Sequence, residues 1–334
     1  MPSLKTKNQT ERIGALDFTK GILVLFMILY HSLNYHGIFP NRYLPFVAPG
    51  FIMISGFIIS SIYFLKYGQD INRGRKRLAV RSIKLLLIFT ILNIASRIAW
   101  PAYNDGILGE IRNFAGNWVE IYLVGSPRKV AFDVLIPIGY TLMAAIFVPR
   151  SLPMGAIIIV LSAISAFSAN IFLENNTGSV YMLTMTSAGM IGMAMGLLPA
   201  QIINAFSRSW MRIGWLFVCY GIVALCGGYY YATQILSTLI ALIIIYSIGG
   251  RIEHDNRINK KIILYGQYSL LSYIVQIALL KMMFLLVLKF HLLNPKIILT
   301  ISLITILTYL VIAVVDFTRF KCRKIDILYR AVFA

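Results

Sequence analysis

Residues 14–35 read GALDFTKGILVLFMILYHSLNY, an apolar stretch that nevertheless carries charged and polar side chains. A helix crosses the hydrocarbon core of a membrane with about 20 mostly apolar residues. Comparable stretches recur along the 334-residue chain. The sequence predicts an all-α membrane protein, a polytopic bundle of ten transmembrane helices at 14–35, 47–65, 83–100, 130–149, 154–173, 179–199, 213–231, 234–250, 268–290 and 297–318.

The composition excludes ordinary soluble proteins. Hydrophobic residues make up 59% of the chain and charged residues only 13%, whereas soluble domains are about 25% charged. The net charge of +19 would suggest nucleic acid in a soluble protein. In a membrane protein the same excess is typical of Lys and Arg in cytoplasmic loops. The sequence also contains no zinc or di-metal constellation, so we expect no metal.

The distribution of basic residues predicts the topology. If the N-terminus is cytoplasmic, the loops on that side carry 22 Lys and Arg residues and the opposite loops carry 6. The positive-inside rule then places both termini in the cytoplasm. We expect a single integral-membrane domain over residues 1–334, with a membrane core at 12–318 and a basic cytoplasmic tail at 319–334. The long outer connection, at about 100–129, contains aromatic residues suited to the membrane interface.

Polar residues on the first helix are candidates for a functional site, because such groups are costly inside a membrane. Lys20 and His31 are eleven residues apart, which places them on one helix face about 16 Å apart along the axis. Asp17 lies near the same stripe. An interfacial anchor with a salt bridge would also explain Arg12, Asp17 and Lys20. His31 is either a satisfied buried histidine or a general base working near pH 7.

A second candidate is the basic stripe formed by Arg77, Arg81 and Lys84, which recur at helical i, i+4, i+7 spacing. Such a stripe can serve as a topogenic or lipid-headgroup patch. It can equally grip phosphate groups from the cytoplasm. The spacing alone leaves both interpretations open.

The segment Arg12-Ile13-Gly14-Ala15-Leu16-Asp17-Phe18-Thr19-Lys20-Gly21, with His31 downstream, resembles the opening of the acyltransferase family 3 membrane proteins, whose signature is R-x-x-x-L-D-x-x-R-G followed by a histidine. Ser55-Gly56-Phe57 and the basic stripe follow in the family's order. Three later segments are similar to the sister group, the heparan-α-glucosaminide N-acetyltransferase-like proteins: 134–140, 191–196 and 266–273. Two departures are Lys20 in place of arginine and Gln276 near a position where many members have histidine.

The resemblance implies an acyl-CoA-dependent acyltransferase that moves an acyl group, with acetyl-CoA as the expected donor, to a hydroxyl or amine of an extracytoplasmic glycan. His31 would be the base or the acyl carrier. The acyl-CoA phosphates would be held by the basic cluster with Asp17 as an orienting partner: Arg12, Asp17, Lys20, Arg77, Arg81 and Lys84. The expected location is the bacterial inner membrane, with membrane lipid as a partner and no nucleic acid.

Other interpretations remain open. A polytopic transporter or flippase for a glycan or lipid-linked substrate would also have ten spans and an intramembrane lysine such as Lys281. However, the two five-helix halves show no internal repeat of the kind common in transporters. An acyltransferase-like scaffold without activity is a third possibility, motivated by Lys20 and Gln276. Arg97 is a candidate for anchoring or acceptor contact, and His36 is the rival of His31 as base.

Overall fold

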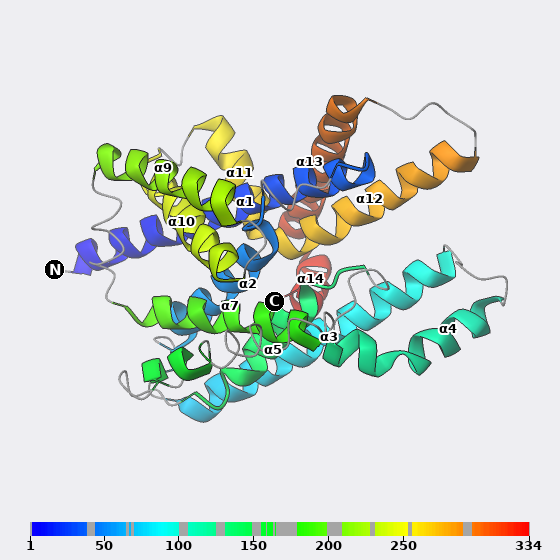
Figure 1. Ribbon diagram of the computed structural model, residues 1–334, viewed down its shortest axis with the longest axis horizontal. Helices are drawn as coiled ribbons and strands as arrows, with labels where there is room; N and C mark the ends of the chain where they lie inside the picture. Colours follow the sequence, from blue (N-terminus) through cyan, green and yellow to red (C-terminus); the bar gives the residue numbers. More distant parts are fainter. Residues whose placement is uncertain are drawn as a thin grey trace. The chain divides into compact units, whose positions relative to one another are not determined.

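The computed structural model describes residues 2–38, 44–64, 67, 70–99, 106–124, 131–148, 155–157, 159–162, 164, 179–198, 209–227, 231–252, 256–289 and 296–333. Helices are the regular elements throughout these residues, and no strand occurs among them (Figure 1). The chain divides into two compact units, residues 1–50 with 200–334, and residues 51–199.

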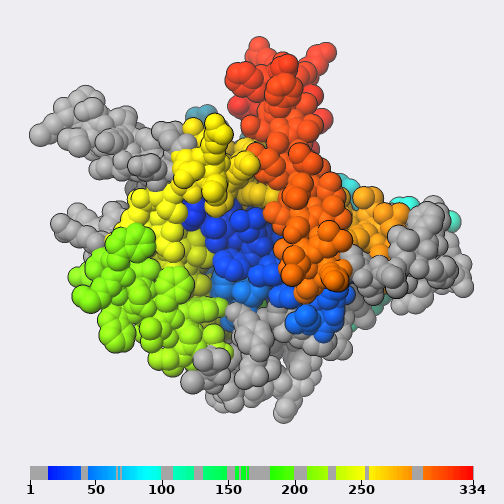
Figure 2. Space-filling view, turned by 90° about the horizontal axis from the view of Figure 1, so that it is seen from above, coloured from blue at the N-terminus to red at the C-terminus, as the bar shows by residue number. Residues whose placement is uncertain are grey.

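The first unit is built around α1 (Pro2–Tyr35). This helix contacts α10 (Tyr231–Gly249), α11 (Arg257–Gln267), α12 (Ser269–Lys289) and α13 (Ile297–Lys321). Further out, α9 (Trp210–Gly227) packs on α10, and α14 (Arg323–Phe333) packs on α13. In Figure 2 the blue surface of α1 lies between the yellow surface of the α10–α11 region and the orange surface of α13. The first helix is therefore the central helix of its unit.

Glycines allow α1 and α11 to approach at backbone distance. A Cβ at Gly21 would collide with the carbonyl oxygen of Ile262, and a Cβ at Gly266 would collide with the carbonyl oxygen of Asp17. Small residues at helix interfaces permit this close approach in membrane proteins. The two contacts hold the charged part of α1 against α11.

The second unit begins at Phe51, within α2 (Val47–Ile58). Its further helices are η2 (Ile59–Phe64), α3 (Ile71–Ala99), α4 (Gly106–Gly116), η3 (Glu120–Val124), α5 (Leu135–Ala144) and α7 (Ser179–Leu197). Within it, α5 contacts both α3 and α7. The Ser82 hydroxyl on α3 donates a hydrogen bond of 2.8 Å to the carbonyl of Gly139 on α5. Gly192 on α7 lies against the backbone of Met53, where a Cβ would not fit.

Among the described residues, six helices are long and apolar enough to cross a membrane: Gly14–Tyr35, Val47–Phe64, Ile71–Ile98, Tyr231–Gly249, Ser269–Val287 and Ile297–Lys321. Their length and composition indicate an integral membrane protein. Shorter apolar helices occupy Leu135–Ala144, Tyr181–Leu197 and Trp210–Ala224, where three further spans were predicted. The predicted span 154–173 lies largely outside the described residues. The helical fold is thus confirmed in the described residues, whereas ten spans, the sides of the termini and a single domain stay predictions.

The side chains of α13 are distributed as expected for a helix facing lipid. Its buried residues form one stripe, Thr300, Ile304, Thr308 and Ile312. The opposite side exposes large apolar side chains along almost the whole helix: Leu299, Leu303, Ile306, Leu310, Val314, Phe317 and Phe320. A soluble protein rarely exposes a continuous apolar surface of this kind. Polar groups inside and apolar groups outside fit a hydrocarbon surrounding.

One boundary prediction was wrong. The third span was expected to begin at residue 83, but α3 begins at Ile71. Asp70 caps this helix, because its Oδ1 accepts a hydrogen bond of 3.0 Å from the backbone amide of Arg73. An Asp at this position satisfies an amide that would otherwise lack a helical partner. The basic residues after it, good helix formers, therefore extend the span at its start.

Candidate functional site in the first unit

His31 lies in the part of the first unit where α1 meets α12. Its Nε2 atom is buried and has no hydrogen-bond partner in the described part of the chain. The Tyr273 ring of α12 lies 6.4 Å from the imidazole, centroid to centroid, and the Tyr30 ring meets it edge-on at 5.5 Å. Two aromatic rings thus flank an imidazole whose Nε2 lone pair or proton remains available.

Other polar side chains are buried on α1, on α12 and on α13, which contacts both of these helices. Ser32, Gln276 and Thr308 are each 0% exposed. The Ser32 and Thr308 hydroxyls, together with both polar atoms of the Gln276 amide, also lack hydrogen-bond partners among the described residues. Gln276 is one turn beyond Tyr273 on α12, the helix that faces His31.

Unsatisfied buried polar atoms are costly in a folded protein, about 1–3 kcal/mol for each group. Several of them on adjoining helices call for an explanation, and a bound water and a functional role are two such explanations. In a membrane protein such groups commonly line a binding or transport site. The interior around His31 is therefore suited to hold a polar group of a substrate.

The two histidines of α1 have different surroundings. His36 is hydrogen bonded through Nε2 to the Thr300 hydroxyl of α13 at 3.0 Å. Its ring also packs edge-on against Tyr35 at 5.0 Å. His36 Nε2 thus has a hydrogen-bond partner, whereas His31 Nε2 has none in the described part of the chain.

Near the middle of α1, the side chains of Asp17 and Lys20 form an ion pair. Lys20 Nζ lies 2.5 Å from Asp17 Oδ1, and the two side chains are 19% and 13% exposed. The expected pairing of Asp17 with a neighbouring cation is therefore present. The side chain of Arg12 lies outside the described part of the chain. Along α1, the Lys20 position is about 16 Å from His31.

The predicted basic stripe belongs to α3, in the second unit. Arg81 donates a hydrogen bond of 2.7 Å to the hydroxyl of Tyr63, and its guanidinium lies 5.8 Å from that ring's centroid. Arg77 has the same relationship with Tyr67, with a hydrogen bond to the hydroxyl and a ring distance of 5.1 Å. Two tyrosines at i, i+4 spacing thus orient two arginines at i, i+4 spacing.

None of Arg77, Arg81 and Lys84 forms an ion pair with a carboxylate among the described residues. Tyrosine hydroxyls occupy only some of the five N–H donors of each guanidinium. The stripe therefore keeps net positive charge and free donors, as an anion-binding surface requires. This stripe lies in the second unit and the Asp17–Lys20 pair in the first.

Remaining polar residues of the predicted spans have structural partners. Arg97 forms an ion pair with the buried Glu110 of α4 at 3.5 Å, which supports its anchoring interpretation. Asp133 accepts a hydrogen bond of 2.9 Å from the Tyr181 hydroxyl. Lys281 is half-buried on α12. In the described residues, no group of three or more His, Cys, Asp or Glu side chains is arranged to hold a metal ion.

The sequence singled out His31 but not the buried polar residues of α12 and α13 in the same unit. Tyr273 was noted only within a glycine-containing motif, and Gln276 only as a departure from a family pattern. Thr308 was missed, although Thr300 and Thr308 recur eight residues apart in an apolar span and could have been read as one face.

Comparisons of the chain with protein-family models, with curated proteins and with solved structures find no match.

Proposed function

We propose that this protein is a membrane acyltransferase that takes an acyl group from acyl-CoA, with acetyl-CoA as the donor, and transfers it to a hydroxyl of an extracytoplasmic glycan. The observation that supports this proposal best is the state of His31. In the described part of the chain, its Nε2 is buried without a hydrogen-bond partner, and further buried polar groups on α1, α12 and α13 also lack one. The motif around Asp17 and Lys20 adds the resemblance to acyltransferase family 3.

The proposed topology has ten spans, with both termini in the cytoplasm and the membrane being the bacterial inner membrane. The Lys and Arg asymmetry supports this orientation. The proposed orientation assigns the Asp17–Lys20 turn of α1 and the basic stripe of α3 to the cytoplasmic side. On that side, the candidates for binding acyl-CoA phosphates are Arg12 and Lys20 in the first unit and Arg77, Arg81 and Lys84 in the second. Asp17 would act by orienting Lys20.

In the proposed reaction, His31 accepts the proton of the acceptor hydroxyl as its oxygen attacks the thioester carbon. A C–O bond forms, the C–S bond breaks, and the leaving sulfur takes up a proton to give free CoA thiol. General-base assistance contributes typically ~10²–10⁴-fold to such a reaction. An amide N–H can stabilise the negative charge that develops on the carbonyl oxygen, and the unpartnered Gln276 amide is suited to this role.

The test is thiol release from acetyl-CoA by the purified protein in nanodiscs. Water replaces the acceptor hydroxyl in this assay, and a sample without acetyl-CoA corrects for the protein's own cysteines. Wild-type protein should release thiol slowly, and His31→Ala should abolish release while acetyl-CoA binding is retained. His36→Ala is the matched control, because its imidazole already bonds Thr300, and it should retain most of the release.

Each contrary result has a definite meaning. Full release by His31→Ala would contradict the role of His31 while leaving the enzyme class in place. Acetyl-CoA binding without release, with or without a glycan acceptor, would favour an inactive scaffold. Absence of any acyl-CoA binding by the wild type, also with a longer acyl chain, would favour the transporter.

A further inference from the structure

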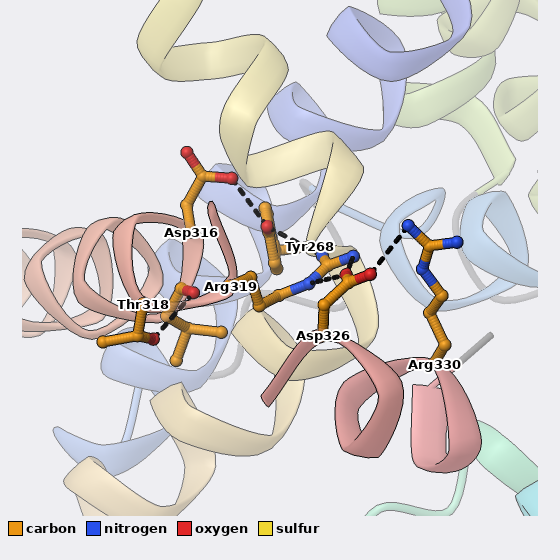
Figure 3. Close-up of polar contacts among 7 residues, drawn as sticks. Tyr268, Asp316, Thr318, Arg319, Asp326 and Arg330 are labelled. Atoms are coloured by element: carbon orange, nitrogen blue, oxygen red, sulfur yellow. Dashed lines mark hydrogen bonds and ion pairs between the residues drawn. The ribbon is translucent and has the colours of Figure 1, made fainter. Parts of the chain in front are cut away.

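The last helix, α14, is joined to the end of α13 by a cluster of charged and aromatic side chains (Figure 3). Arg319 of α13 donates to Asp326 Oδ1 of α14 through Nε at 3.0 Å and through Nη2 at 2.7 Å. Its Nη1 donates to the hydroxyl of Tyr268 at 2.8 Å. The Tyr268 hydroxyl in turn donates to Asp316 Oδ1 at 2.6 Å. We call these four residues the Arg319 latch.

Aromatic stacking reinforces the latch. The Arg319 guanidinium lies 3.9 Å from the ring centroid of Tyr329 and 5.3 Å from that of Tyr268. On α14 itself, Arg330 Nη2 lies 2.7 Å from Asp326 Oδ2. The hydrogen bond from Arg319 keeps the pKa of Asp326 below its usual range. Asp326 thus remains a carboxylate that ties both arginines, and the base of α14 has a defined attachment.

The remainder of α14 exposes an apolar face. Ile325, Leu328 and Val332 recur at i, i+3, i+7 spacing, which places them on one side of a helix, and they are 39%, 65% and 39% exposed. Arg323 and Arg330 recur seven residues apart and lie on the opposite side by the same geometry. No residue of α14 is fully buried. The exposed Ile327 also lies on that opposite side. The helix therefore has one apolar side and an opposite side that carries both arginines, and its own unit leaves the apolar side uncovered.

The position of α14 in the chain shows where its apolar side can be covered. The exposed apolar stripe of α13 continues to Phe320, which is 92% exposed. The apolar side of α13 thus continues into its last turn, which ends at Lys321. The extended residue Cys322 then breaks the helix, and α14 starts at Arg323. The amphipathic helix begins two residues after a membrane-spanning one.

The charge of this region complements one kind of membrane surface. Residues 319–334 contain the basic residues Arg319, Lys321, Arg323, Lys324 and Arg330 and one acidic residue, Asp326, which the latch neutralises. Basic residues next to the end of a span attract anionic lipid headgroups. A helix with an apolar side and a Lys/Arg-rich side typically lies in the plane of the interface.

From these observations we infer that α14 is an interfacial helix, seated in anionic lipid headgroups where α13 leaves the membrane, with Ile325, Leu328 and Val332 toward the acyl chains. The Arg319 latch fixes its base to α13 and to Tyr268, the residue between α11 and α12. This inference does not depend on acyl transfer. A second copy of the chain, or another protein, covering the same face is the competing outcome in the test.

The test uses the full-length protein with Cys219→Ser, Cys226→Ser and Cys322→Ser and one new cysteine, labelled with an environment-sensitive dye and reconstituted in nanodiscs. Leu328→Cys places the dye on the apolar side, and Arg323→Cys is the matched control on the cationic side of the same helix. Quenchers attached to the upper acyl chain should quench the dye at 328 more strongly than at 323. Aqueous iodide should show the reverse order.

Lipid composition tests the electrostatic part. Lipid quenching at 328 should be stronger in nanodiscs that contain phosphatidylglycerol than in phosphatidylcholine alone, and Asp326→Asn should weaken it by releasing the latch. Equal iodide access at both positions with no lipid quenching would overturn the inference, because α14 would then stand in water. A dye at 328 protected from both quenchers would also overturn it and indicate a protein partner.

Discussion

Gly266 of α11 lies directly against the backbone carbonyl of Asp17 in α1, at a distance that leaves no room for a Cβ. The same glycine approaches the backbone amide of Gly21. The carboxylate that pairs with Lys20 is thus carried by a turn of α1 whose backbone is held by α11.

Gly266→Ala should therefore lower the free energy of unfolding by about 1–3 kcal/mol, the usual cost of overpacking a well-packed contact. Thermal unfolding in detergent measures the effect. Gly214→Ala is the matched control, because Gly214 also lies in a helix of the first unit but has open space where a Cβ would project. It should be neutral or stabilising by about 0.5–1 kcal/mol, since alanine is the better helix former. Equal effects of the two substitutions would contradict the close packing of α1 on α11.

The Asp17–Lys20 pair predicts an energetic coupling between its members. Lys20→Met should destabilise the protein because it leaves a carboxylate that is only 13% exposed without its partner. Asp17→Asn with Lys20→Met should cost less than the sum of the single substitutions, with a coupling of about 0.5–3 kcal/mol. A double-mutant cycle of thermal stability gives this value. Additive effects would mean that the ion pair contributes no stability and that Lys20 is retained for another purpose.

The contact between Arg81 and Tyr63 predicts a graded effect on donor binding. Tyr63→Phe keeps the ring near the guanidinium but removes the hydroxyl that accepts from it. If Arg81 holds a phosphate, losing one orienting hydrogen bond of about 1 kcal/mol should weaken acyl-CoA binding about fivefold. Arg81→Gln should weaken it further. Titration of acyl-CoA binding is the measurement, and Arg75→Gln, an exposed arginine of the same helix, is the control. An unchanged affinity in Arg81→Gln would leave the stripe as a lipid or topogenic patch.

The long helices could be predicted from the sequence, because an uninterrupted apolar run such as 297–318 is long enough to span a membrane. Inside a membrane, a helix satisfies the backbone hydrogen bonds of such a run. Hydropathy could not predict the start of α3, since its first turns are basic and resemble a loop until Asp70 is recognised as a cap. The amphipathic part of the C-terminal tail was also missed, although the spacing of Ile325, Leu328 and Val332 indicates it.

The candidate site was predicted less completely than the fold, for a physical reason. His31 could be found because an ionisable residue in an apolar run is costly. Its surroundings depend on how α12 and α13 pack against α1, and these contacts join residues far apart in the chain. The hydrogen bond between His36 and Thr300 spans 264 positions, and no local pattern indicates it. The same applies to the approach of Tyr273 to His31.

Gln276 provides the sharpest test of whether the interior around His31 is a functional site. Its amide is 0% exposed and has no hydrogen-bond partner in the described part of the chain. Replacing such a group by an apolar side chain of similar size removes a desolvation cost of about 1–3 kcal/mol. Gln276→Leu should therefore raise the unfolding temperature. If the amide binds the acyl carbonyl, the same substitution should lower thiol release from acetyl-CoA.

Gln234→Leu is the matched control for this substitution. The Gln234 amide lies in the same unit but donates a hydrogen bond of 3.2 Å to the carbonyl of Pro45. Loss of this hydrogen bond in Gln234→Leu should lower the unfolding temperature and leave the rate of thiol release per folded molecule unchanged. A lower stability for Gln276→Leu as well would show that the amide has a structural partner. A group retained at a cost in stability is expected to act in function. Higher stability with unchanged thiol release would contradict this expectation for Gln276, because the amide would then be unsatisfied without serving the reaction.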